Sequence, residues 1–589
     1  MSADGTIPDH SQRATPTVNS VPLRRGDFAN LAEALDYAAT GETGANFYAG
    51  GKLAAAVPYR VLRERSLLLA RRLIGFGLER GARLAIVAET TPDFLRFFFA
   101  CQYAGLVPVA LPSAVNLGGH DAFVHKLRTM IEASGAEAAV ASTSFLRFLD
   151  EAASDLDLRL CGAPELFDAL AAPDVELEPT RSDELAYLQF TSGSTGTPKA
   201  AMLTERALLA NLQGSINHGL HLRDDDRFVS WLPFYHDMGL VGCLLTVMAG
   251  QRSIDYIDTR EFAMRPRRWL ELMTHSKATI AYSPPFGYEM CARRVRPSDV
   301  GAYDLSHWRI AGIGAEPISP EVPARFAELL APAGFDPLAF VPSYGMAEAA
   351  LAVSFSPLRS GIMVDWLDAS DLADHLLATR VEPGTGNGFV RCGRPLPGHD
   401  LAVLDDSDRP LPERHAGSIH VRGPSVMSGY FQQPLLTAQV LKDGGWLDTG
   451  DIGYIVDGEV VVTGRHKDMI IVNGRNIWPQ DIERIVERQP ELRSQDASAF
   501  GVTGVDGVET AVVVVQSNPL DEIARDALVR RIRAEILEDL GIACVIELVP
   551  RHTLPRTSSG KLSRTATRSG YLERVAARGK ETAHVVISS

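Results

Sequence analysis

The sequence predicts an α/β protein whose large N-terminal part is followed by a small α+β domain. Up to about residue 350, segments with apolar residues at helical spacing alternate with short apolar runs such as residues 84–88. This alternation is typical of a parallel sheet with helices on both faces. From about Gly393, short apolar stretches alternate with turns rich in Gly, Pro and Asp, which indicates a smaller β-rich part.

The first predicted elements follow the apolar periodicity. Residues 59–78 and 94–105 predict helices, and each is followed by a short apolar run, at residues 83–89 and 106–111, that predicts a strand. Residues 1–25 are rich in Ser, Thr, Pro and Asp, and we expect them to form a flexible N-terminal arm.

The end of the chain predicts a separate α+β domain. Residues 479–487 predict a helix, because proline suits the first turn and the apolar residues share one face. Residues 527–540 predict a second helix that ends at Gly541, and residues 510–516 and 543–549 predict strands. We therefore divide the chain into an arm, a large domain and a C-terminal domain, at residues 1–25, 26–465 and 466–589.

Composition excludes several classes of function. The net charge of −15 over 589 residues argues against a general attraction to nucleic acid or anionic membranes. The longest apolar run, near residues 239–250, is too short to span a membrane, and the polar start of the chain has no apolar core for a signal peptide. The six cysteines are scattered singly, which argues against zinc, iron–sulfur and disulfide frameworks. We expect a cytoplasmic protein.

A loop rich in glycine and hydroxyl side chains is the strongest chemical signal. It follows an apolar run at residues 185–190 that predicts a strand. Its glycines allow the backbone to turn tightly and present N–H groups to an anion, and its hydroxyls and lysine add donors. This is not a Walker A loop, because no Gly-Lys-Ser/Thr follows the glycines, and a flexible turn is the alternative. The residues expected to bind phosphate are Thr191, Ser192, Gly193, Ser194, Thr195, Gly196 and Lys199.

Six further segments follow this loop in an order that resembles the adenylate-forming superfamily of acyl-CoA synthetases, nonribosomal peptide adenylation domains and luciferases. The segments are residues 231–240, 312–317, 344–348, 446–451, 464–468 and 555–561. The resemblance extends from about residue 30 to 570. It implies two α/β subdomains and a β-rich subdomain in the large domain. It also implies that the small C-terminal domain, residues 466–589, is a mobile lid.

The resemblance implies that a carboxylate attacks the α-phosphorus of ATP, with Mg²⁺ as cofactor and pyrophosphate as the leaving group. Such a site needs cations and a metal around the phosphate oxygens. By resemblance, Lys561 in the lysine loop (residues 555–561) is the main catalytic cation, and Glu348 is the Mg²⁺ ligand. The alternatives are an exposed lysine near the end of the chain and a glutamate that serves a helix start.

The nucleotide site is also assigned by resemblance. Tyr344 is expected to stack on adenine, and Asp451 to accept hydrogen bonds from the ribose hydroxyls. Lys467 is expected at the hinge of the lid. Ala347 departs from the family pattern, in which most relatives carry threonine, so one phosphate contact is in doubt. The remaining residues assigned to the nucleotide are Gly314, Ala315, Glu316, Pro317, Ser343, Gly345, Met346 and Arg465.

The acyl side of the site contains His236, which by resemblance is a gate between the nucleotide and the acyl pocket and is counted with Lys561 among the catalytic residues. It is not expected to act as a general base, because the carboxylate is already ionised near neutral pH. A metal-binding pair with Asp237 is not expected, because adjacent side chains rarely point together. The predicted acyl pocket consists of Met238, Gly239, Ser283, Pro284 and Phe286; ordinary core is the alternative.

An insertion at residues 357–388 lengthens the connection between Glu348 and Gly393. It includes an apolar run at residues 362–367 and a predicted short helix at residues 371–377. This feature resembles the fatty acyl-AMP ligases, in which such an insertion restrains the lid and disfavours CoA. The resemblance implies transfer of a fatty acyl group to a holo (phosphopantetheinylated) acyl carrier protein, often for polyketide biosynthesis, by a monomer.

Two other hypotheses remain open from the sequence. A fatty acyl-CoA ligase would share the first half-reaction and would differ in turning over CoA. A catalytically inactive protein that binds acyl groups or nucleotides would be expected to lack the catalytic residues, yet Lys561, Glu348 and Asp451 are all present.

Overall fold

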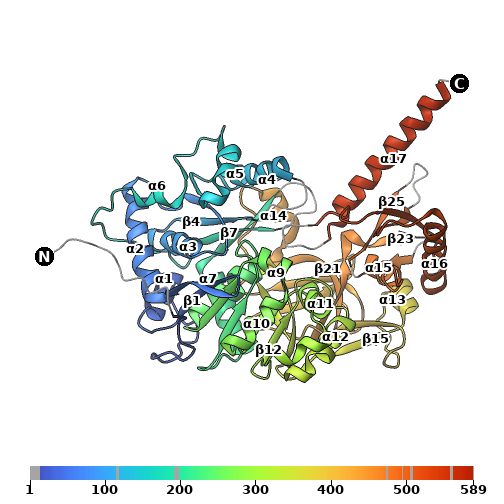
Figure 1. Cartoon of the computed structure of the whole chain (residues 1–589), viewed down its shortest axis with the longest axis horizontal. Helices are drawn as coiled ribbons and strands as arrows, with labels where there is room; N and C mark the ends of the chain where they lie inside the picture. The colour runs from blue at the N-terminus through green and yellow to red at the C-terminus, as the bar shows by residue number, and fades with distance from the viewer. Residues whose placement is uncertain are drawn as a thin grey trace.

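The computed structural model describes residues 13–113, 119–191, 198–472, 475–493, 495–503, 509–556 and 562–587. It confirms the predicted α/β class, with a large N-terminal domain and a small C-terminal lid (Figure 1). No helix in these described ranges is long and apolar enough to cross a membrane.

The first sheet has six strands in the order β6-β5-β3-β4-β7-β8, all parallel except β8, which is antiparallel to β7. Alternate residues of β3 face opposite helical layers. Leu84 and Ile86 share a core with α2 and α3, whereas Ala85 and Val87 pack with α4 and α5. The strands are β3 (Arg83–Val87), β4 (Val107–Leu111), β5 (Ala138–Val140), β6 (Leu160–Gly162), β7 (Leu185–Thr191) and β8 (Lys199–Thr204). The helices are α2 (Tyr59–Gly75), α3 (Pro92–Ala104), α4 (Gly119–Ser134), α5 (Thr143–Ala153) and α6 (Pro164–Asp168).

The second sheet has nine strands in the order β17-β14-β13-β12-β11-β9-β10-β1-β2. Its strands from β13 to β1 in this order are parallel, and the outer strands β2, β14 and β17 are antiparallel to their neighbours. The strands are β1 (Gly44–Ala49), β2 (Lys52–Pro58), β9 (Arg227–Ser230), β10 (Ser253–Ile257), β11 (Ile280–Ser283), β12 (Ile310–Ile313), β13 (Phe340–Gly345), β14 (Ala352–Phe355) and β17 (Arg394–Pro395). The associated helices are α1 (Leu31–Ala38), α7 (Glu205–Gly214), α8 (Thr246–Ala249), α9 (Thr259–Met264), α10 (Arg267–Ser276), α11 (Pro285–Arg294) and α12 (Glu321–Leu330), with π-helical turns η1 (Ser215–Gly219) and η2 (Met238–Leu245).

The N-terminal segment is held against the second sheet, so the prediction of a flexible arm is wrong for residues 13–25. The backbone N–H of Thr15 donates to Asn46 Oδ1 at 2.9 Å, and Arg227 Nη1 donates to Thr15 O at 2.8 Å. Buried Arg227 also pairs with Asp255 at 2.6 Å. A buried guanidinium needs acceptors for its donors, and the segment supplies one of them. Residues 1–12 lie outside the described part of the chain.

The β-rich part and the insertion pack beside each other. The insertion forms an antiparallel pair, β15 and β16, joined by a segment that includes the short helix α13. Asp365 on β15 is 1% exposed; it accepts from Tyr454 Oη at 2.8 Å and pairs with Arg414 at 3.2 Å. The elements are β15 (Val364–Leu367), α13 (Ala369–His375), β16 (Asn387–Val390), β18 (Asp400–Leu404), β19 (Gly417–Arg422), α14 (Pro434–Val440), β20 (Leu441–Lys442), β21 (Trp446–Val456) and β22 (Glu459–Arg465).

The lid has its own core between helices α15 and α16 and its strands. Helix α15 coincides with the predicted span, and Gly541 ends α16 with a φ of 66°. Helix α17, which the sequence did not predict, extends away from the body (Figure 1). The elements are β23 (Ile470–Val472), β24 (Arg475–Ile477), α15 (Pro479–Glu487), β25 (Ala497–Thr503), β26 (Glu509–Ser517), α16 (Glu522–Leu540), β27 (Cys544–Pro550) and α17 (Arg564–Ile587).

A buried carboxyl group at the start of α7 makes stability depend on pH. Glu205 is fully buried; its Oε2 accepts from Leu31 N at 3.2 Å, and its Oε1 has no hydrogen-bond partner among the described residues. Burial raises the pKa of Glu205 from 4.5 to about 8. The unfolded chain therefore loses this proton first, and folding is penalised as pH rises from about 4.5 to 8, after which the penalty is constant.

We therefore expect Glu205→Gln to stabilise the protein at pH 8. The difference from the unmodified chain should shrink as pH falls and vanish below about pH 4, since each pKa unit corresponds to about 1.4 kcal/mol. Urea unfolding midpoints measured across pH test this, with exposed Glu165→Gln as the control. An equal midpoint shift at all pH values would contradict the assignment.

Candidate active site

Residues from β12, β13, β21 and β22 meet where the parallel strands of the second sheet end, the usual position of a ligand site in an α/β fold. Tyr344 at the end of β13 donates its hydroxyl to Asp451 Oδ2 at 2.8 Å. Arg465 Nε donates to Asp451 Oδ1 at 3.1 Å. Gly314 lies against β13, since a Cβ added to it would be 2.5 Å from Ser343 O. The structure thus brings together five of the residues assigned to the nucleotide.

The Asp451 carboxylate is the centre of this group. It is buried, and each of its oxygens accepts one hydrogen bond from the chain, which leaves each oxygen able to accept a second. The negative charge of Asp451 raises the pKa of Arg465, and burial raises that of the Tyr344 hydroxyl. Because each oxygen can accept a second hydrogen bond, the carboxylate can bind a pair of sugar hydroxyls.

Glu348 lies in a short 3₁₀ turn, η6 (Ala347–Ala349), directly after β13. Its Oε1 accepts from the Tyr430 hydroxyl at 2.8 Å, and its backbone O accepts from Met427 N at 2.8 Å. Burial raises the pKa of Glu348, and the Tyr430 hydrogen bond opposes that rise. The part of the chain that the structure describes contains no cluster of three or more His, Cys, Asp or Glu that could hold a metal. A single carboxylate fits Mg²⁺, which binds through one or two carboxylates together with substrate phosphates and water.

Asn211 on α7 positions this turn, although no motif in the sequence signals its role. Its buried Nδ2 donates to Ala349 O at 3.0 Å and to Ala352 O at 2.8 Å. Gly345 is required at the start of the turn, because a Cβ there would be 1.9 Å from Leu351 O. The predicted nucleotide residues Met346 and Ala347 therefore lie in a tightly constrained segment.

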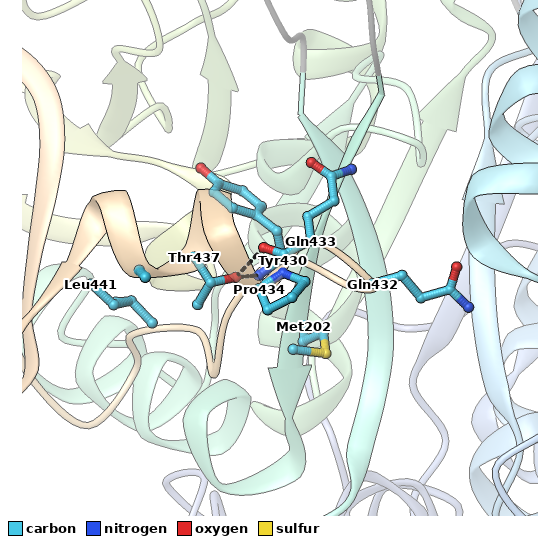
Figure 2. A pocket seen from close by; sticks show the side chains of 8 residues that line it. Met202, Tyr430, Gln432, Gln433, Pro434, Thr437 and Leu441 are labelled. Carbon is cyan, nitrogen blue, oxygen red and sulfur yellow. Dashed lines mark hydrogen bonds between the residues drawn. The ribbon is translucent and has the colours of Figure 1, made fainter.

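Tyr430 is the second functional residue that sequence reasoning missed; its only signal was an aromatic residue directly after Gly429. Besides its bond to Glu348, its ring lies 5.6 Å from Lys199 Nζ, within the range of a cation–π contact. Its backbone N–H donates to Thr437 Oγ1 at 2.9 Å, which fixes the start of α14 (Figure 2). Tyr430 thus connects the predicted metal ligand to the end of the phosphate loop.

A cavity of about 370 Å³ lies beside Tyr430 (Figure 2). None of the described residues predicted to bind ATP lines it, although Gln433 in its wall donates to Pro198 O at the end of the phosphate loop, at 3.0 Å. Its lining residues come from β8 and from the segment around α14: Met202, Tyr430, Gln432, Gln433, Pro434, Thr437, Ala438 and Leu441.

The acyl side begins at η2. His236 Nδ1 lies 3.0 Å from Asp237 Oδ1, so the expectation that these adjacent side chains would diverge is wrong. The reason is that Asp237 turns its carboxylate back to accept from Met238 N at 2.7 Å at the start of η2, which brings it beside the imidazole. Gly239 is needed there, because a Cβ would be 2.2 Å from Pro233 O.

The other predicted acyl residues lie at the end of β11. Ser283 is buried and donates to Pro284 O at 2.8 Å. Phe286 N donates to Glu316 Oε1 at 3.1 Å, so the start of α11 is joined to the predicted adenine loop. The ring centroid of Phe286 lies 5.7 Å from that of Trp231. In the predicted adenine loop, Ala315 has a φ of 67°, and both Ala315 and Pro317 are exposed.

Two predicted groups lie outside the described residues: Lys561 and the loop residues Ser192, Gly193, Ser194, Thr195 and Gly196. The ends of the phosphate loop are described, and Thr191 pairs with Lys199 in the β7–β8 ladder. Lys467, the predicted hinge residue, lies in η8 (His466–Asp468), and burial lowers its pKa. The positive charge of neighbouring Arg465 contributes to this lowering.

Comparisons with known proteins agree over nearly the whole chain. The model of the AMP-binding enzyme family matches residues 39–431. A protein of Caulobacter vibrioides, provisionally named an acyl-CoA synthetase, is 44% identical over 562 residues, which cover 95% of this chain and 98% of that protein. The medium-chain-fatty-acid–[acyl-carrier-protein] ligase JamA of Moorena producens is 31% identical over 585 residues, with 94% and 96% covered. A structure from studies of fatty acyl-adenylate ligases of E. coli and L. pneumophila matches with a TM-score of 0.89 and 43% identity, covering 94% of this chain and 100% of that chain.

The hydrogen bond from Tyr430 to Glu348 predicts a change in pH dependence. The bond favours the ionised carboxylate, so Tyr430→Phe should raise the pKa of Glu348 further and move the acid limb of the adenylation rate to higher pH. Pyrophosphate exchange measured from pH 5 to 9 tests this, with Tyr571→Phe in the lid as the control. An unchanged acid limb would show that Glu348 does not control it.

Proposed function

Because the chain belongs to the AMP-binding enzyme family and is an acyl-adenylate ligase, we propose that it activates a fatty acid and transfers it to the phosphopantetheine thiol of a holo acyl carrier protein. In the first step a carboxylate oxygen of the fatty acid forms a bond to the α-phosphorus of ATP, and the bond to pyrophosphate breaks. In the second step the thiolate attacks the acyl carbonyl carbon, and AMP leaves as a thioester forms.

The residues have separate roles in this proposal. Asp451 holds the ribose, Tyr344 stacks on adenine, and Glu348 with Tyr430 beside it would hold Mg²⁺. The metal would neutralise charge on the phosphate oxygens as pyrophosphate leaves. Lys561 would stabilise the charge that gathers around the α-phosphate.

The contact between the insertion and the lid is the observation that supports the carrier protein as acceptor. Arg475 Nε on β24 lies 2.7 Å from Asp374 Oδ1 on α13, and Asn476 Nδ2 donates to Ala373 O at 3.3 Å. The insertion is itself anchored to the large domain by buried Asp365. A lid restrained in this way cannot rotate freely after adenylation, which favours an acceptor that brings its own docking energy over free CoA.

A fatty acyl-CoA ligase is the second candidate, and the relative provisionally named an acyl-CoA synthetase, at 44% identity, favours it. Product analysis with ATP, Mg²⁺ and dodecanoate separates the two. We expect acyl-AMP to accumulate in the presence of CoA and to be consumed by holo carrier protein. Efficient formation of acyl-CoA would retain the adenylation chemistry and reject the proposed acceptor.

The ion pair between Arg475 and Asp374, which we call the clamp, can be tested by changing one side chain. Asp374→Ala removes the partner of Arg475 without changing the lid, and acyl-CoA formation should rise by about two- to fivefold, the amount expected from an exposed ion pair. The control is Asp539→Ala, which removes the comparable Arg488–Asp539 pair within the lid at 2.7 Å. Equal CoA turnover in the two variants would contradict the clamp.

The role of Lys561 can be tested separately from the acceptor. Lys561→Ala should lower acyl-AMP formation by two or more orders of magnitude, since in this proposal it removes a cation that stabilises the transition state. Binding of ATP, measured by calorimetry, should largely survive. Near-normal adenylation in this variant would reject the assignment.

A further inference from the structure

Arg564, the first residue of α17, is held by two carboxylates from different parts of the lid. Its Nε and Nη2 donate to Glu483 Oε1 and Oε2 at 2.8 and 2.7 Å, and its Nη1 donates to Asp468 Oδ2 at 3.2 Å. The Arg564 side chain is 23% exposed, and those of Glu483 and Asp468 are 13% and 19% exposed. A partly buried bidentate pair forms only when the guanidinium and the carboxylate lie in one plane. It therefore fixes the orientation of the two groups as well as the distance between them.

One carboxylate lies in the turn of the predicted hinge, and the other lies on a helix of the lid core. Asp468 is the last residue of η8, the turn that contains the predicted hinge residue Lys467 and follows Arg465 of the nucleotide site. Glu483 is on α15, where its Oε1 also accepts from Ala499 N at 3.0 Å at the start of β25. Arg564 therefore joins the hinge to the core of the lid.

Arg564 also lies at the base of the lysine loop. The ends of that loop are brought together by an antiparallel bridge between Arg556 and Leu562 and by a hydrogen bond from Ser563 N to Pro555 O at 2.9 Å. We call Pro555, Arg556, Leu562 and Ser563 the neck of the loop. Arg564 follows the neck directly, so its three hydrogen bonds set where the neck lies relative to the hinge.

We propose that Arg564 is a positioning residue for adenylation, because it fixes the neck of the lysine loop to the hinge turn and to α15. The inference rests on the proposed role of Lys561. It assigns no contact between Arg564 and the substrate. In the proposed function Lys561 acts at the α-phosphate in the first step, so the acyl transfer step should depend little on Arg564.

The same helix offers a matched control. Arg574 makes a bidentate pair with Glu547 on β27, with Nη2–Oε2 at 2.6 Å, and its side chain is 34% exposed. Within the described ranges, the side-chain hydrogen bonds of Arg574 run to Glu547 on the lid sheet and not to the hinge or the neck. Loss of either arginine should weaken the lid, whereas only loss of Arg564 should displace the neck.

The test measures the two half-reactions separately. Arg564→Gln should lower kcat for pyrophosphate exchange about 100-fold, the effect of a displacement of about 1 Å in a catalytic group, with the KM for ATP changed less than threefold. Transfer from supplied acyl-AMP to whichever thiol the unmodified enzyme accepts should stay within threefold. Arg574→Gln should leave both rates near normal, and Arg564→Lys should recover part of the adenylation rate.

Three outcomes would overturn the proposal: normal adenylation in Arg564→Gln, an equal loss in both half-reactions that follows a drop in Tm, or the same loss in Arg574→Gln. Lys561→Ala is measured in the same assay. If that variant adenylates normally, the proposed role of the lysine fails, and this result is distinct from a failure of Arg564 alone. Asp468→Asn combined with Arg564→Gln should be no slower than Arg564→Gln, because both changes break one connection.

Discussion

The site depends on the two hydrogen bonds that the carboxylate of Asp451 accepts. The carboxylate receives hydrogen bonds from Tyr344, at the end of a strand of the second sheet, and from Arg465, the last residue of β22. Asp451 and Arg465 face each other in the β21–β22 hairpin of the β-rich part, so this buried carboxylate joins that part to the second sheet. A buried carboxylate is stable only while its donors remain, and this requirement fixes the position of the β-rich part relative to the sheet.

Much of the fold could be predicted because local signals and tertiary structure agree. The helix Pro479–Glu487 has proline in its first turn and one apolar face, and it forms as expected; Gly541 ends α16 in the left-handed conformation that glycine favours. The residues assigned to the nucleotide came from motifs, and Gly314, Tyr344, Asp451 and Arg465 do meet. In each case the signal used for the prediction lies within one short segment of the sequence.

What could not be predicted depends on partners distant in the sequence. Asn211 and Tyr430 are ordinary residues until the fold brings them to the turn that contains Glu348. Residues 13–25 have the composition of a flexible segment, yet buried Arg227 requires the carbonyl group that Thr15 provides. The contact between His236 and Asp237 arises because a π-helical turn begins there, and no periodicity signals such a turn.

The lid combines two kinds of ion pair that differ in burial, and the difference suits an enzyme with two half-reactions. Arg564 makes a bidentate pair with Glu483 and a single hydrogen bond to Asp468, and both are largely buried, so η8, α15 and the neck of the lysine loop are held together. The lid's ion pair with the insertion, Arg475 with Asp374, joins side chains that are 32% and 38% exposed, and Asn476 adds only a long hydrogen bond of 3.3 Å to Ala373 O. An exposed pair contributes at most about 1 kcal/mol, so it biases the position of the lid without locking it. Under the proposed function, such a domain would position Lys561 in the first step and would still be displaced in the second by the docking energy of an acceptor.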